Sequence, residues 1–104
     1  MQPVPSAENT ATRTRPGLVF FHSNVSGRCR RIEGFLAQVL QRRHNHDTFR
    51  VYSVAREQRP DLVEKFGITA VPTLVVIEDR SVSARLDGPR SCREIERFLS
   101  PWLQ

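Results

Sequence analysis

Residues 66–77 read FGITAVPTLVVI, and this stretch decides the fold more than any other part of the chain. Gly67 stands where a short helix would end in the left-handed conformation, which glycine adopts without steric cost. Pro72 precedes Thr73–Ile77, a run whose β-branched and apolar residues are typical of a buried strand. The segment therefore predicts a helix end, a turn that contains a proline and a buried strand, in that order.

Upstream of this segment, the chain predicts a strand followed by a long helix. Leu18–Phe21 is a short apolar run between a glycine and polar residues, which is typical of a strand buried on both faces. From Ser26 onward the apolar residues recur with a helical period and form one stripe: Ile32, Phe35, Leu36, Val39 and Leu40. Basic residues at 42–44 are expected to close this helix, and residues 44–47 to form a polar loop.

The remaining elements follow from the same kinds of signal. Thr48–Val54 is β-branched and aromatic, which favours a second strand. Pro60 fits the first turn of a short helix over Asp61–Phe66, since its missing N–H needs no partner there. Alternation over Val82–Leu86 predicts an edge strand with one wet face. Residues 91–94 read SCRE, a capping box that opens a last helix; its apolar residues are Ile95, Phe98, Leu99, Trp102 and Leu103.

These elements give the order βαβαββα, an α/β architecture with a mixed four-stranded sheet flanked by helices. Residues 1–17 contain three prolines and few large apolar side chains, so we expect a flexible N-terminal tail. Residues 18–104 then form one domain, because a chain of 104 residues has room for one core. The chain shows neither a run long enough for a membrane span nor a secretory signal, so we expect a cytoplasmic monomer.

Three segments, taken in order, resemble the thioredoxin family, and the resemblance runs from Leu18 to Leu103. Residues 25–29 read VSGRC and stand where the family carries its Trp-Cys-Gly-Pro-Cys redox motif. Residues 66–74 are similar to the family's Tyr-Gly-Ile-x-x-Ile-Pro-Thr-Leu segment, which contains a cis-proline. Gly88 matches a glycine at the rim of the family's substrate groove. The resemblance implies a thioredoxin-like fold.

The resemblance also implies a groove for an extended protein segment that carries a thiol or a disulfide, or for a low-molecular-weight thiol. Its reactive positions would be Ser26 and Cys29. The family contacts substrate through backbone groups at the position of Val71, next to its cis-proline. The substrate-binding residues implied by the match are Gly27, Arg28, Val71, Pro72 and Gly88. The family's site uses no cofactor and no metal ion.

The match departs from the family where the attacking cysteine should stand, because Ser26 occupies that position, either naturally or as a replacement of a cysteine. An aliphatic hydroxyl does not ionise near neutral pH and forms no mixed disulfide, so the ordinary dithiol cycle cannot run. The family's buried acid falls at Phe20, its motif tryptophan at Val25 and its helix-kinking proline at Gly34. We expect at most weak monothiol exchange through Cys29 or, alternatively, a non-catalytic protein-interaction module.

Other residues have plainer interpretations beside the functional ones. The helix N-terminus favours a Cys29 thiolate and burial favours the thiol, so Cys29 is either reactive or an inert, half-buried residue. Cys92 is expected to be a spectator and His22 a packing residue. The histidines within residues 44–47 lack enough further ligands for a metal site. The chain has 16 Lys and Arg against 11 Asp and Glu, but no recognition motif supports nucleic-acid binding.

Overall fold

A computed structural model of the chain describes residues 15–41 and 48–103. Residues 1–14 of the tail predicted over residues 1–17, the helix end predicted at residues 42–44 and the polar loop predicted at residues 44–47 lie outside the described residues. Within the described part, strands and helices follow one another in the predicted order βαβαββα.

The sheet is four-stranded, mixed and ordered β2-β1-β3-β4. Its central strands are β1, Gly17–His22, and β3, Thr73–Glu78, which pair antiparallel. Its edge strands are β2, Arg50–Ala55, parallel to β1, and β4, Ser81–Asp87, antiparallel to β3. The predicted mixed sheet, with an edge strand after the 66–77 segment, is therefore confirmed.

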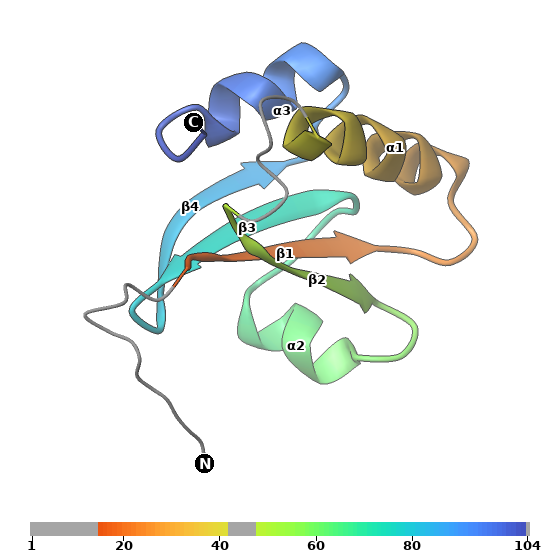
Figure 1. Ribbon diagram of the computed structural model, residues 1–104. Helices are drawn as coiled ribbons and strands as arrows, with labels where there is room; N and C mark the ends of the chain where they lie inside the picture. The colour runs from red at the N-terminus through yellow and green to blue at the C-terminus, as the bar shows by residue number, and fades with distance from the viewer. Residues whose placement is uncertain (1–14, 42–47, 104) are drawn as a thin grey trace.

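Helices cover both faces of the sheet (Figure 1). On one face lie α1, Gly27–Gln41, and α3, Cys92–Leu99, which pack against each other. On the other face lies α2, Pro60–Lys65, a single short helix. Burial on both faces explains why the central strands are uniformly apolar. The strand residues under α1 and α3 are Leu18, Phe20, Leu74 and Val76, and those on the α2 face are Val19, Phe21, Val54 and Val75.

Several element ends differ from the sequence expectations, each for a local reason. Strand β1 includes Gly17, assigned above to the tail, and the preceding Pro16 accepts a hydrogen bond from the N–H of Arg50 at 2.9 Å. In the capping box, Ser91 Oγ accepts from the Glu94 N–H at 3.1 Å as predicted. The Glu94 carboxylate, however, accepts from the N–H of Arg90 at 2.7 Å. Arg90 is the residue before the N-cap, whereas a capping box uses the N–H of the N-cap itself.

Arg85 of β4 holds the turn that follows α2 and contains Gly67. Gly67 has φ of +63°, as expected of a left-handed helix stop. The Arg85 guanidinium donates to the carbonyl oxygens of Phe66 and Gly67 at 2.7 and 2.8 Å, and so ties the end of α2 to the sheet. After this anchor, Thr73 Oγ1 donates to the carbonyl of Ala70 at 2.7 Å. The turn that leads into β3 is therefore held at both ends.

Candidate functional site

The Ser-x-x-Cys segment lies where β1 ends and α1 begins. Ser26 acts as the N-cap of α1, because its Oγ accepts from the N–H of Cys29 at 3.2 Å. Its carbonyl oxygen accepts from the N–H of Arg30 at 3.3 Å. The Ser26 hydroxyl therefore has a structural role in starting the helix.

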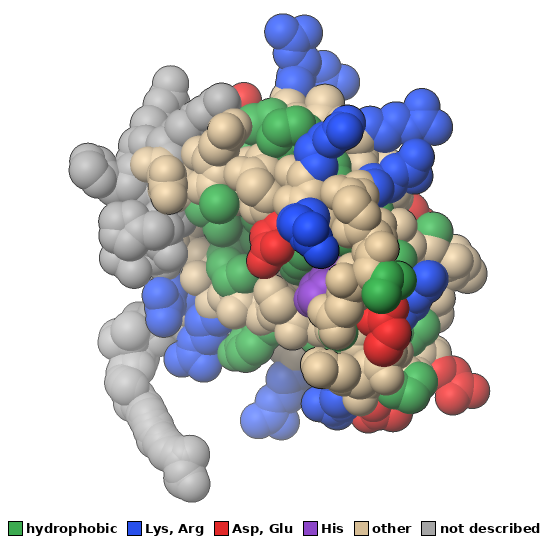
Figure 2. Space-filling view, turned by 90° about the vertical axis from the view of Figure 1, so that its right-hand side faces the viewer, with side chains coloured by type: hydrophobic (Ala, Val, Ile, Leu, Met, Phe, Trp, Pro, Cys, Tyr) green, Lys and Arg blue, Asp and Glu red, His purple; other side chains and the backbone are tan. Residues whose placement is uncertain are grey.

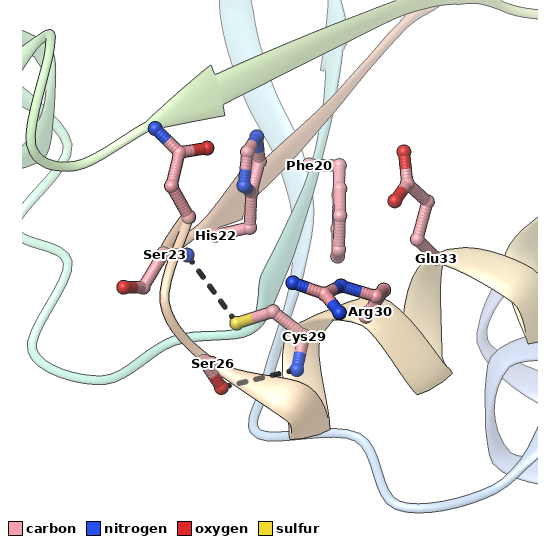
Figure 3. Close-up of a pocket in the computed structure, with 8 residues that line it drawn as sticks. Phe20, His22, Ser23, Ser26, Cys29, Arg30 and Glu33 are labelled. Atoms are coloured by element: carbon pink, nitrogen blue, oxygen red, sulfur yellow. Dashed lines mark hydrogen bonds between the residues drawn. The ribbon is translucent and has the colours of Figure 1, made fainter.

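Cys29 lies in the core rather than at the surface. Its exposed fraction is 1%, and its neighbours belong to the cluster under α1 and α3. The backbone N–H of Ser23 donates to the Cys29 sulfur at 3.4 Å, so the sulfur faces back toward the loop that precedes the helix (Figure 3). The thiol is therefore fully buried rather than half-buried, and whether it reacts stays a prediction.

A hollow of about 200 Å³ opens beside this cysteine. Its floor is Phe20, whose ring stacks on that of His22 with centroids 5.2 Å apart and planes at 17°. Arg30 and Glu33 of α1 complete it, and Figure 3 shows the Phe20 ring between His22 and Glu33. His22 therefore has the packing role that the sequence predicted, while its ring is also visible on the outer face of the molecule in Figure 2.

A carboxylate from elsewhere in the chain holds the loop before the motif. The hydroxyl of Ser23, a residue only 3% exposed, donates to Glu57, and the N–H of Asn24 donates to the same carboxylate at 3.1 Å. The N–H of Val25 in turn donates to Ser23 Oγ at 3.3 Å. Glu57 thus fixes the backbone that supplies the N–H bonded to the Cys29 sulfur. Sequence analysis missed Glu57, which lies far along the chain from the motif and belongs to no motif itself.

The hydrogen bond from the Ser23 hydroxyl, followed by that from the Asn24 N–H, lowers the pKa of Glu57 below its ordinary value. A carboxyl with a lowered folded-state pKa stabilises the fold above the unfolded-state pKa, and this contribution is lost as pH falls through the folded-state pKa. We therefore expect Glu57→Gln to destabilise the protein at neutral pH, and we expect the difference from wild type to shrink as pH falls below the ordinary glutamate pKa of about 4.3 and through the lower folded-state pKa.

Denaturant unfolding of wild type and Glu57→Gln from neutral to acidic pH measures this difference. Two other carboxyls also have lowered pKa values: Asp61 because of its hydrogen bond from Arg59, and Glu78 because of hydrogen bonds from Ser83 and Trp102. Both are present in wild type and in the variant, so their contributions cancel in the comparison. Glu64→Gln, at an exposed position of α2, is the matched control. A difference between wild type and Glu57→Gln that stays constant over the acid range would contradict the assignment.

The opposite side of the predicted groove is built by the segment that decides the fold. The Val71–Pro72 peptide bond is cis. Gly88, with φ of +57°, donates its N–H to the carbonyl of Pro72 at 2.9 Å. Pairing of β3 with both neighbours begins at Thr73, so the backbone of Val71 lies outside the ladders of the sheet.

The structure joins the seven predicted site residues only in part. Ser26 is hydrogen-bonded to Cys29, Pro72 is hydrogen-bonded to Gly88, and Val71 packs against the core cluster that contains Cys29. Gly27 and Arg28 are exposed on the first turn of α1. The hollow beside Cys29 is lined from β1 and α1, and Val71, Pro72 and Gly88 are not among its walls.

The second cysteine, Cys92, lies at the start of α3. Neither Cys29 nor Cys92 forms a disulfide bond, and the Cys92 thiol points toward the carbonyl oxygen of Phe35 at 3.8 Å and toward Gln38 Oε1 at 3.9 Å. Residues 15–41 and 48–103 contain no group of three His, Cys, Asp or Glu that could hold a metal ion. In the same residues no helix is long and apolar enough to cross a membrane.

Taken together, the mixed sheet with helices on both faces, a Ser-x-x-Cys segment opening α1 and a cis X–Pro bond before β3 define a thioredoxin-fold protein with one motif cysteine. The sequence model of the Thioredoxin family matches residues 7–101, and the chain belongs to this family.

Solved structures of thioredoxins are similar over most of their length. Desulfothioredoxin from Desulfovibrio vulgaris Hildenborough is 31% identical, with a TM-score of 0.72 over 85% of this chain and 82% of that one. Oxidised thioredoxin from Plasmodium falciparum is 20% identical, with a TM-score of 0.75 over 88% and 84% of the two chains. Thioredoxin from Fasciola hepatica is 21% identical, with a TM-score of 0.74 over 86% and 83%. Family membership supports a function of the thiol–disulfide oxidoreductase type in general.

Proposed function

We propose that this protein binds extended polypeptide segments carrying a thiol or a disulfide, and that its own chemistry is limited to slow monothiol exchange at Cys29. The observation that carries this proposal is that Ser26 and Cys29 have different structural roles. The half-buried Ser26 hydroxyl caps the helix, and the sulfur of Cys29 is buried. The groove can therefore bind without the dithiol turnover of its relatives.

The binding part of the proposal needs only backbone and shape. The Val71 backbone lies outside the sheet ladders, and the Pro72–Gly88 hydrogen bond holds the adjoining rim. An extended partner segment can pair with free backbone groups in the manner of an added strand. The exposed arginines at 28 and 31, close to the motif, suit a partner segment with acidic residues.

In the proposed exchange, the partner carries a disulfide R–S–S–R′. The Cys29 thiolate attacks one sulfur, forms Cys29–S–S–R and releases R′–S⁻. With no second thiol at Ser26, an external low-molecular-weight thiol R″–SH must attack the mixed disulfide. It forms R–S–S–R″ and returns Cys29 to the reduced state. This cycle suits a reducing compartment such as the cytoplasm, where both free cysteines stay reduced.

A second candidate function is a non-catalytic interaction module that uses the same groove. The 1% exposure of Cys29 favours it, because thiolate chemistry requires access as well as ionisation. The two candidates share the binding groove and differ in whether Cys29 of the folded protein ever reacts.

Mass spectrometry of a Cys92→Ser variant tests the proposal, since Cys29 is then the only thiol. We expect 5,5′-dithiobis(2-nitrobenzoate) to form one adduct per folded chain, much more slowly than in the unfolded chain, and glutathione to remove it. Cys29→Ser/Cys92→Ser is the control that forms none. A folded protein that stays unmodified while the unfolded chain reacts would exclude the exchange and leave the non-catalytic module.

A further inference from the structure

A second hollow lies at the far end of the sheet from the motif. It measures about 450 Å³ and is formed where β1 and β2 begin and β3 ends, on the face that α2 covers only in part. Figure 1 places the start of β1 and the β3–β4 turn together at the end of the sheet away from the β1–α1 loop. A six-residue strand separates the two sites by roughly 16 Å. The volume is that of a small-molecule site.

Positive charge converges on this hollow from three separate segments. Arg15 precedes β1, Arg50 opens β2 and Arg80 lies in the β3–β4 turn, and all three line the hollow with one carboxylate, that of Asp79. In the part of the chain that the structure describes, Arg50 and Arg80 form no side-chain hydrogen bond or ion pair. Their guanidinium donors are therefore available to a ligand, and the planar fork matches phosphate oxygens.

The β3–β4 turn holds Arg80 in a conformation that arginine rarely adopts. Asp79 and Arg80 form a two-residue connection and have φ of +52° and +69°. Such turns favour glycine at the second position, and a residue with a Cβ is disfavoured there. An arginine at this position is a local cost to the hairpin, and strained positions of this kind cluster at ligand sites.

The floor of the hollow offers an aromatic face. Tyr52 is 50% exposed and pairs with Val19 across β1 and β2, and Ile77 lies on the same face at the end of β3. A Cβ at Gly17 would lie in ordinary van der Waals contact with Tyr52 Cε2, at 3.7 Å, so the Tyr52 ring lies beside Gly17 of the neighbouring strand. A half-exposed ring beside guanidinium groups suits a planar group that stacks and an anion that is held next to it.

We propose that this hollow binds a small phosphorylated ligand with a planar ring, of the nucleotide class. Arg50 and Arg80 hold the phosphate groups, Arg15 adds positive potential at the rim, and Tyr52 stacks on the ring. The site is independent of the thiol chemistry, because it shares no residue with the hollow beside Cys29.

Titration of the ¹⁵N-labelled full chain with ADP and with inorganic pyrophosphate tests the proposal. We expect saturable shifts of backbone signals at residues 50–52 and 77–80, with ADP binding more tightly. Arg50→Gln should weaken ADP at least about tenfold, as expected for loss of a charge-assisted hydrogen bond. Tyr52→Ala should weaken ADP but leave pyrophosphate unchanged. Arg93→Gln removes the same charge from an exposed position of α3 and should change neither.

Arg80→Gly separates binding from folding. Glycine relieves the left-handed conformation of the turn, so the melting temperature should stay equal or rise while ADP binding weakens at least about tenfold. The proposal is overturned if ADP gives no saturable shifts, or if they centre on residues 26–29. It is equally overturned if Arg93→Gln weakens ADP as much as Arg50→Gln does, since the binding would then follow net charge alone.

Discussion

Ser26→Cys is expected to raise the rate of reduction of a model disulfide by at least about 100-fold over wild type. In the variant, position 26 supplies a thiol at the start of α1, and Cys29 lies one helical turn away, with its backbone N–H 3.2 Å from Oγ of the wild-type Ser26. Clearance of the mixed disulfide then becomes intramolecular, and well-oriented intramolecular steps gain many orders of magnitude over bimolecular ones. Turnover with dithiothreitol as reductant measures the change.

The matched control is Ser26→Cys combined with Cys29→Ser. This pair keeps the new outer thiol and removes the resolving sulfur, so in a single-turnover reaction without dithiothreitol it should stop at the mixed disulfide, whereas Ser26→Cys should release the second thiol. A Ser26→Cys protein as slow as wild type would contradict the prediction. It would show that the loss of activity reaches beyond one sulfur atom, to positions such as Phe20 where the family carries its buried acid.

The fold was predictable because its signals are local and consistent with one another. The segment at residues 66–77 combines a left-handed glycine, a proline and a β-branched run within a dozen residues. The apolar period after Ser26 predicted α1, which the structure confirms over Gly27–Gln41. The start of β2 was placed two residues early, because the aromatic and β-branched content of residues 48–49 does not distinguish a strand from its approach.

The site was less predictable, because its decisive contacts join residues far apart in sequence. Glu57 reaches the loop at Ser23 across 34 positions, and no period or motif marks it. The full burial of Cys29 depends on how α1 and α3 pack together, which a pattern at the motif does not specify. The hollow lined by Arg15, Arg50 and Arg80 is formed by three chain segments at one end of the sheet. These segments meet because of the register of the strands, which the sequence patterns do not specify.

The largest loss of stability is expected from Phe20→Ala, with a decrease of about 3–5 kcal/mol in the free energy of unfolding. Phe20 is 1% exposed, belongs to the cluster under α1 and α3 and stacks on His22. Its removal loses both the buried area and the ring contact, and it enlarges the hollow beside Cys29. Denaturant unfolding at neutral pH measures the change.

Val82→Ala is the matched control, since Val82 is 51% exposed on β4 and its truncation should cost under about 0.5 kcal/mol. A Phe20→Ala protein within about 1 kcal/mol of wild type would show that the core does not depend on this ring. The expected loss of stability would instead show that the core depends on the Phe20 ring. An acid at position 20 would then replace a ring that is buried in the core cluster, so Ser26→Cys alone is the conservative route to test for dithiol catalysis.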